Sequence, residues 1–160
     1  MSFEPLTFTY CSPTADDHLL PTDVRLAIDG ASPCVVVAAH RDDLIVAYVV
    51  ATAAVEAIEV FCVDETRLVI AAARFRGTAA GLFHDRYRFS PSTPAPGEPT
   101  WFMETLLYEH PSQTVHIEEY VPGQATRTVF PDMDLADNYL PTPAPGDWAP
   151  LFAAGPLADV

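Results

Sequence analysis

The sequence contains no lysine, and its eight basic residues, all arginines, stand against 22 aspartates and glutamates. The formal net charge at pH 7 is therefore −14. Proteins that bind nucleic acids or anionic membranes bring cations to phosphate groups, and this chain has few cations to bring. We expect no nucleic-acid partner and no membrane partner, and instead a surface that suits a basic macromolecule.

Long apolar segments are also missing. The longest uncharged apolar run, residues 44–55, has 12 residues, whereas a membrane-spanning helix needs about 20. The first residues lack the basic and apolar regions of a secretory signal. The three cysteines are odd in number and form no CxxC pair, which is typical of free thiols in a reducing compartment. These absences predict a cytoplasmic protein.

The rest of the composition predicts a folded chain, because 49% of the residues are hydrophobic and 11% are aromatic. We expect one β-rich domain over residues 1–160. Two similar proline-rich segments, 91–99 and 141–150, are expected to be extended loops. Each leads to a tryptophan, Trp101 or Trp148. The C-terminus is expected to fray.

Short β-branched and aromatic runs, separated by turn-forming residues, predict successive hairpins. These runs are 35–39, 44–50, 58–63, 67–73, 82–89, 100–109, 114–121 and 125–130. The fold class is therefore mainly β, an antiparallel meander of eight to nine strands forming a sandwich or barrel, with at most one or two short helices. Continuous apolar residues at 35–37 and 44–50 indicate central strands that are covered on both faces. Alanines at 51–57 leave one alternative open, a helix over 42–59.

No catalytic signature occurs in the chain. His116 and Glu118 are two residues apart, so on a strand they would share a face, and His110 lies just across the predicted turn. These three are weak candidates for a metal site, because the chain has no HxH, HExxH or paired-cysteine motif. A solvated strand face explains them more simply. We predict no catalytic residue, no metal, no cofactor and no enzymatic activity.

Half of the basic charge lies within 15 residues, at Arg74, Arg76, Arg86 and Arg88. If the two segments that hold them pair antiparallel, the four guanidinium groups could share one face. They would then bind a carboxylate or phosphate, or form an ion ladder with Glu104 and Glu118, which is the favoured interpretation. The alternation in 82–89 sets His84, Arg86 and Arg88 against Phe83, Asp85, Tyr87 and Phe89, so that Asp85 falls on the aromatic side.

Acidic and aromatic residues are interleaved on the predicted hairpin 100–121. Rigid aromatic side chains often anchor protein interfaces, and acidic charge speeds the encounter with a basic partner. A half-solvated strand in an acidic protein would show a similar pattern. The candidate partner-binding residues are Trp101, Glu104, Tyr108, Glu109, Glu118, Glu119 and Tyr120.

Taken together, these features favour an acidic protein-binding domain, an inhibitor or immunity-type protein that occludes a basic, nucleic-acid-directed toxin or enzyme. Such inhibitors are commonly monomers or dimers. One alternative is a β-barrel that binds or converts a small molecule at a polar site in its mouth. A further alternative is a structural or assembly subunit.

Overall fold

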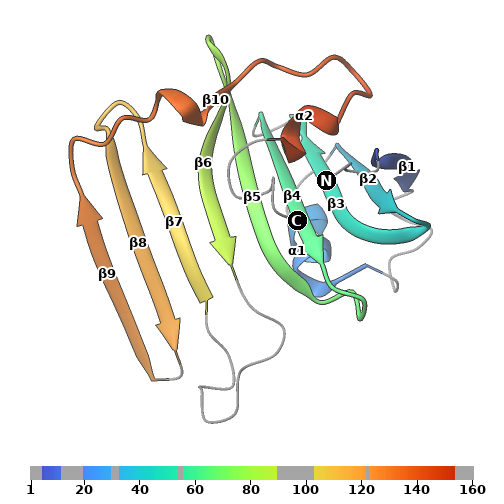
Figure 1. The fold of residues 1–160 in the computed structure, drawn as a ribbon, viewed down its shortest axis with the longest axis horizontal. Coiled ribbons are helices and arrows are strands. Elements are labelled where there is room, and N and C mark those ends of the chain that lie inside the picture. The colour runs from blue at the N-terminus through green and yellow to red at the C-terminus, as the bar shows by residue number, and fades with distance from the viewer. Residues whose placement is uncertain are drawn as a thin grey trace.

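The computed structural model describes residues 5–11, 20–29, 33–53, 56–89, 103–121 and 123–153. Nine strands follow one another across a single antiparallel sheet, each paired with the next in sequence (Figure 1). The strands are β1 (Thr7–Cys11), β2 (Cys34–Arg41), β3 (Leu44–Thr52), β4 (Ala57–Val63), β5 (Val69–Thr78), β6 (Gly81–Phe89), β7 (Met103–Glu109), β8 (Thr114–Val121) and β9 (Gln124–Phe130). A tenth strand, β10 (Tyr139–Leu140), pairs with β6.

The mainly β class and the sequential antiparallel meander are confirmed. The sheet is not closed, because β1 and β9 lie at its two edges and do not pair with each other. The helix considered for 42–59 is wrong, since β3 and β4 occupy most of that range. β-Branched side chains favour this choice, because they pack well on a pleated surface and lose rotamer freedom in a helix.

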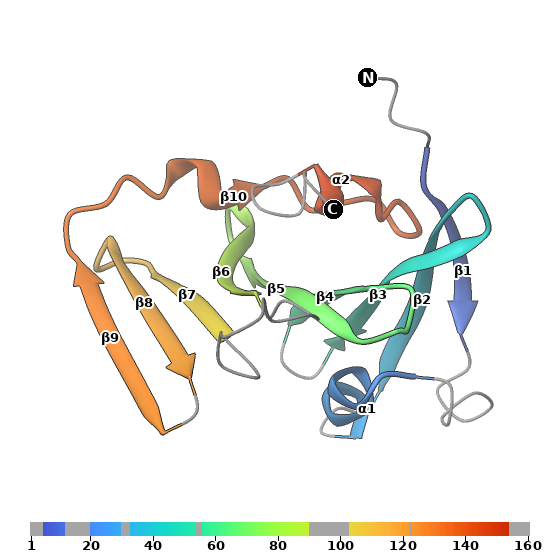
Figure 2. The same cartoon turned by 60° about the horizontal axis from the view of Figure 1, so that its bottom comes forward.

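Two short helices were not located by the sequence analysis, α1 (Thr22–Asp29) and α2 (Ala149–Phe152). Figure 2 shows them on opposite sides of the sheet. We call these sides the α1 face and the α2 face. No helix in the described part of the chain is long and apolar enough to cross a membrane.

The central strands are buried on both faces, as their continuous apolar runs predict. On the α1 face, Val24 of the helix belongs to one core cluster with Val36 and Tyr48. On the α2 face, Leu151 belongs to a second cluster with Val37 and Val49. Consecutive residues of β2 and β3 are therefore buried, at 36–39 and 47–50.

The second proline-rich segment leads into α2, and Trp148 packs half-buried against the core of the α2 face. Trp148 thus docks on the sheet where this proline-rich loop ends. The first proline-rich segment with Trp101, and the C-terminus beyond residue 153, lie outside the described residues.

Strands β7–β9 project from one end of the sheet, and we call residues 103–121 and 123–130 the arm (Figure 2). Among the described residues, β7 pairs with the sheet along residues 86–89 of β6, because β10 pairs with the beginning of that strand. Gly81 begins β6 beside β10. Its φ is +123°, and a Cβ there would collide with the carbonyl oxygen of Leu140. Only glycine fits that position.

A β-bulge in β6 determines which face its side chains take. Arg74 lies opposite Arg86 and Phe75 lies opposite His84, so Asp85 is an extra residue between the two pairs. The alternation in the sequence predicts His84 and Arg86 on one face. That prediction is wrong, because the extra residue shifts the register by one and puts these side chains on opposite faces.

Candidate functional site

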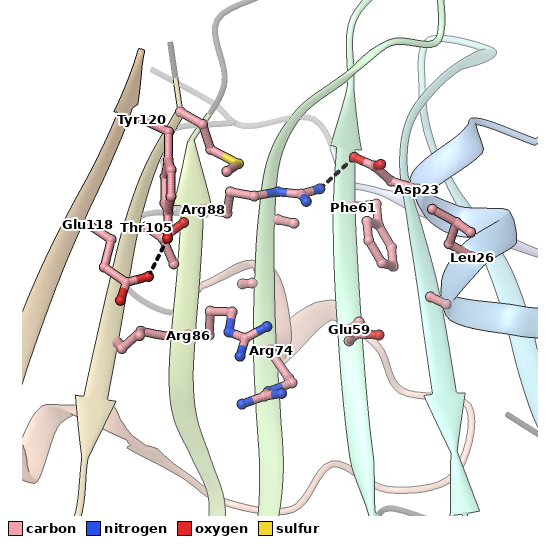
Figure 3. A pocket seen from close by; sticks show the side chains of 15 residues that line it. Asp23, Leu26, Glu59, Phe61, Arg74, Arg86, Arg88, Thr105, Glu118 and Tyr120 are labelled. Atoms are coloured by element: carbon pink, nitrogen blue, oxygen red, sulfur yellow. Dashed lines mark hydrogen bonds and ion pairs between the residues drawn. The ribbon is translucent and has the colours of Figure 1, made fainter. Parts of the chain in front are cut away.

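A groove of about 510 Å³ lies on the α1 face, between α1 and the first two strands of the arm (Figure 3). Its floor is formed by β4, β5 and β6. Three arginines line it, Arg74, Arg86 and Arg88, and we call it the arginine groove. The pairing register brings two of these arginines together, because Arg74 on β5 lies directly opposite Arg86 on β6. On its other side, Arg74 lies directly opposite Glu59 on β4.

The groove arginines differ in their ionic partners. Arg74 donates to Asp85 from Nε at 2.7 Å and from Nη2 at 2.8 Å. Arg76, outside the groove, donates to the same carboxylate at 2.6 Å. Arg88 donates to Asp23 of α1 at 2.6 Å. The side chain of Arg86 forms no ion pair or hydrogen bond within the described part of the chain.

The surroundings of Arg86 disfavour its positive charge. Its pKa is lowered, first by burial and then by the positive charge of Arg74, while Asp85 and Glu59 raise it in part. Arg88 lowers it further. The groove therefore contains an exposed guanidinium group that forms no ion pair with a described residue.

The ion ladder favoured by the sequence is not what the structure contains. Arg74 and Arg76 pair with Asp85, and Arg88 pairs with Asp23. Neither Glu104 nor Glu118 pairs with these arginines. These contacts of Asp85 and Asp23 were not predicted from the sequence. The break in alternation at Asp85 was the one signal that could have indicated the first of these contacts.

The candidate partner-binding residues occupy both faces of the arm. Side chains alternate along strands, so the pairing register places Glu104, Tyr108 and Glu119 on the α2 face. It places the other three described candidates, Glu109, Glu118 and Tyr120, on the α1 face. The seventh, Trp101, lies outside the described residues.

Glu104 and Glu119 lie directly opposite each other on β7 and β8. Glu119 is exposed and accepts a hydrogen bond of 3.1 Å from Thr126 on β9. Phe89 lies opposite Glu104 on the other side and is 40% exposed. The arm thus presents two carboxylates that form no ion pair with the described residues, beside the exposed aromatic ring of β6.

The α1 face of the arm carries a separate polar network. Arg127 donates to His116 Nδ1 from Nε at 3.1 Å, so the proton of a neutral His116 lies on Nε2. That Nε2 is 3.2 Å from Glu109. Tyr120 donates to Glu118 at 2.9 Å, and this hydrogen bond is the main reason that the pKa of Tyr120 is raised.

The weak metal candidates do not form one centre. His110 lies against Phe83 and Tyr139, with ring centroids 5.9 and 5.6 Å away. His116 and Glu118 each contact other partners in the network of the arm. No group of three or more histidine, cysteine or acidic residues suited to a metal ion occurs among the described residues.

Comparison with protein families, with curated proteins and with solved structures finds no match to this chain.

Proposed function

We propose that this protein is a binding domain that docks a basic protein partner on its arm and inhibits it by occlusion. The partner is a nucleic-acid-directed toxin or enzyme, and the protein acts as an immunity-type inhibitor. The observation that carries this proposal is the pair Glu104 and Glu119. Like charges directly opposite on neighbouring strands are destabilising, and a cationic partner would relieve that repulsion.

The charge of the arm and of the segment that follows it supports the same class of partner. Residues 103–121 and 123–140 contain seven acids and one base, Arg127. The acids are Glu104, Glu109, Glu118, Glu119, Asp132, Asp134 and Asp137. Such a surface accelerates the encounter with a basic protein and repels nucleic acid.

The outer edge of the arm adds backbone hydrogen-bonding groups to this surface. All seven residues of β9 are exposed, and β9 ends the order of paired strands. An exposed edge strand can pair with an extended segment of another chain. In this proposal Phe89 supplies an aromatic anchor, and the protein works in the bacterial cytoplasm, as a monomer or dimer, without a catalytic step.

Affinity capture from the lysate of the native host tests this proposal. Wild type is compared with the double variant E104K/E119K and with E65K, a control that reverses an exposed acid on the turn between β4 and β5. We expect wild type and E65K to capture one basic protein at low salt, and the double variant to lose it. Equal capture by all three proteins, or capture of no basic protein, would contradict the proposal.

A further inference from the structure

The arginine groove carries a second inference, which does not depend on the partner proposed for the arm. Its volume of about 510 Å³ falls in the range of small-molecule sites, roughly 300 to 1,000 Å³. Figure 3 shows Arg74, Arg86 and Arg88 reaching into it from two neighbouring strands. The charge and shape of this groove indicate what it binds.

The side chain of Arg86 is exposed and has no ionic partner among the described residues. The chain has 22 acids for eight bases, so a basic side chain has many possible partners. Arg74 pairs with Asp85 and Arg88 pairs with Asp23, yet Arg86 has no ionic partner within the described residues. Moreover, Arg86 lies directly opposite Arg74, so a repulsive pair lies at the centre of the groove.

The bulge at Asp85 creates this arrangement. In a regular strand pair, Asp85 would lie opposite Arg74, and Arg86 would project to the α2 face. The extra residue instead brings Arg86 into the groove, while the buried carboxylate of Asp85 still reaches Arg74. Bulges often re-aim side chains next to functional sites.

The other charges of the groove limit the ligand to a small negative charge. Asp23, Glu59 and Glu118 also line it, so its three arginines face three acids. Asp23 is paired with Arg88, and Arg74 is held by Asp85. Glu118 lies 3.8 Å from Arg127, so the groove charges without an ion pair among the described residues are those of Arg86 and Glu59. The single positive charge of Arg86 suits a monoanion, whereas Glu59 would repel the second charge of a dianion such as phosphate.

The walls of the groove suit an apolar body. Leu26 and Phe61 line it on the side of α1 and β4, while Met103 and Leu107 line it on the side of the arm. Leu26 is 65% exposed, which leaves an apolar side chain in contact with solvent beside the arginines. The planar guanidinium group matches a carboxylate through two parallel hydrogen bonds.

We propose that the arginine groove binds a small amphipathic carboxylic acid, with its carboxylate on Arg86 and its apolar part between Leu26 and Leu107. Glu59 disfavours a second negative charge and so selects a monoanion over a phosphate. Binding neutralises the one groove arginine that lacks a partner. The ligand is held without covalent chemistry.

Calorimetric titration of the full chain tests this inference, with octanoate as the probe and octanamide and inorganic phosphate as comparisons. We expect octanoate to bind saturably at one site, and the other two to bind at least roughly tenfold more weakly. Saturable octanoate binding that octanamide or phosphate equals would overturn the inference. So would the absence of saturable octanoate binding.

Two variants locate the site. R86Q should weaken octanoate binding roughly tenfold or more, whereas R41Q, which removes an arginine on β2 outside the groove, should leave it unchanged. If R86Q fails to fold, R86K is used instead, because lysine keeps the charge but cannot form two parallel hydrogen bonds to a carboxylate. R86K should bind octanoate several-fold more weakly than wild type. Wild-type affinity in R86Q or in R86K would overturn the inference. Capture of a partner by the arm should survive both changes.

Discussion

Asp85 accepts two parallel hydrogen bonds from Arg74, at 2.7 Å from Nε and 2.8 Å from Nη2, although neither residue lies opposite the other in the strand register. The carboxylate is 5% exposed and also binds Arg76. One buried acid thus holds two arginines beside a third, Arg86. The stability of this corner of the sheet should depend on that single negative charge.

We therefore expect D85N to destabilise the protein by roughly 2 kcal/mol, because it leaves neighbouring guanidinium groups without their counter-charge. Loss of one partner of a buried pair costs about 3–5 kcal/mol, and solvent screening at Arg76, which is 59% exposed, reduces this. Urea unfolding measures the effect. The exposed control D137N should change stability by less than about 0.5 kcal/mol, and an equal effect of both variants would refute the prediction.

We expect His84 to make the stability of the protein depend on pH. Its ring is buried among Phe75, Tyr87 and Tyr108. Burial lowers its pKa, although a backbone hydrogen bond at Arg86 and the charge of Asp85 act in the opposite direction. The unfolded chain therefore binds a proton near pH 6.5 before the folded protein does, so this contribution is complete above that pH and is lost below it.

The H84F variant isolates this contribution. The difference in unfolding free energy between wild type and H84F should become less favourable to wild type as the pH falls from about 7.5 to about 5.5. This change in the difference cannot exceed about 1.4 kcal/mol for each pH unit below pH 6.5, because a single proton is involved. Urea titrations at both values measure it, and a difference that does not vary with pH would show that His84 is not held neutral.

The pair Glu104 and Glu119 should be repulsive in the isolated protein. A double-mutant cycle with E104Q, E119Q and the double variant should give a destabilising coupling energy of roughly 0.2–1 kcal/mol at low salt. The coupling should shrink as salt screens it. A coupling of zero at low salt, or an attractive one, would remove the repulsion on which the proposed function rests.

Much of the sheet could be predicted because each strand carries its own signal. The runs from 35–39 to 125–130 are β-branched or aromatic and end at turn-forming residues, and all eight became strands. Strand β1 was not predicted. Helix α1 was also missed, although Val24, Ala27 and Ile28 have helical spacing and pack on the α1 face.

The site was harder to predict, because it depends on register rather than on pattern. A one-residue bulge at Asp85 decides whether Arg86 faces the groove or the opposite side. The opposition of Glu104 and Glu119 likewise depends on how the turn between β7 and β8 sets the pairing. Neither the geometry of that turn nor the position of the bulge could be predicted from the sequence alone.

Two pairs of like charges lie directly opposite each other in the sheet, Glu104 with Glu119 on the arm and Arg74 with Arg86 in the groove. The two proposed binding sites depend on these pairs. The most direct test measures the association rate of the captured basic partner with wild type, E104Q/E119Q and R86Q across a range of ionic strength. We predict a steep fall with salt for wild type and R86Q, and a slower, flatter response for E104Q/E119Q. Identical salt dependence in all three proteins would contradict the account.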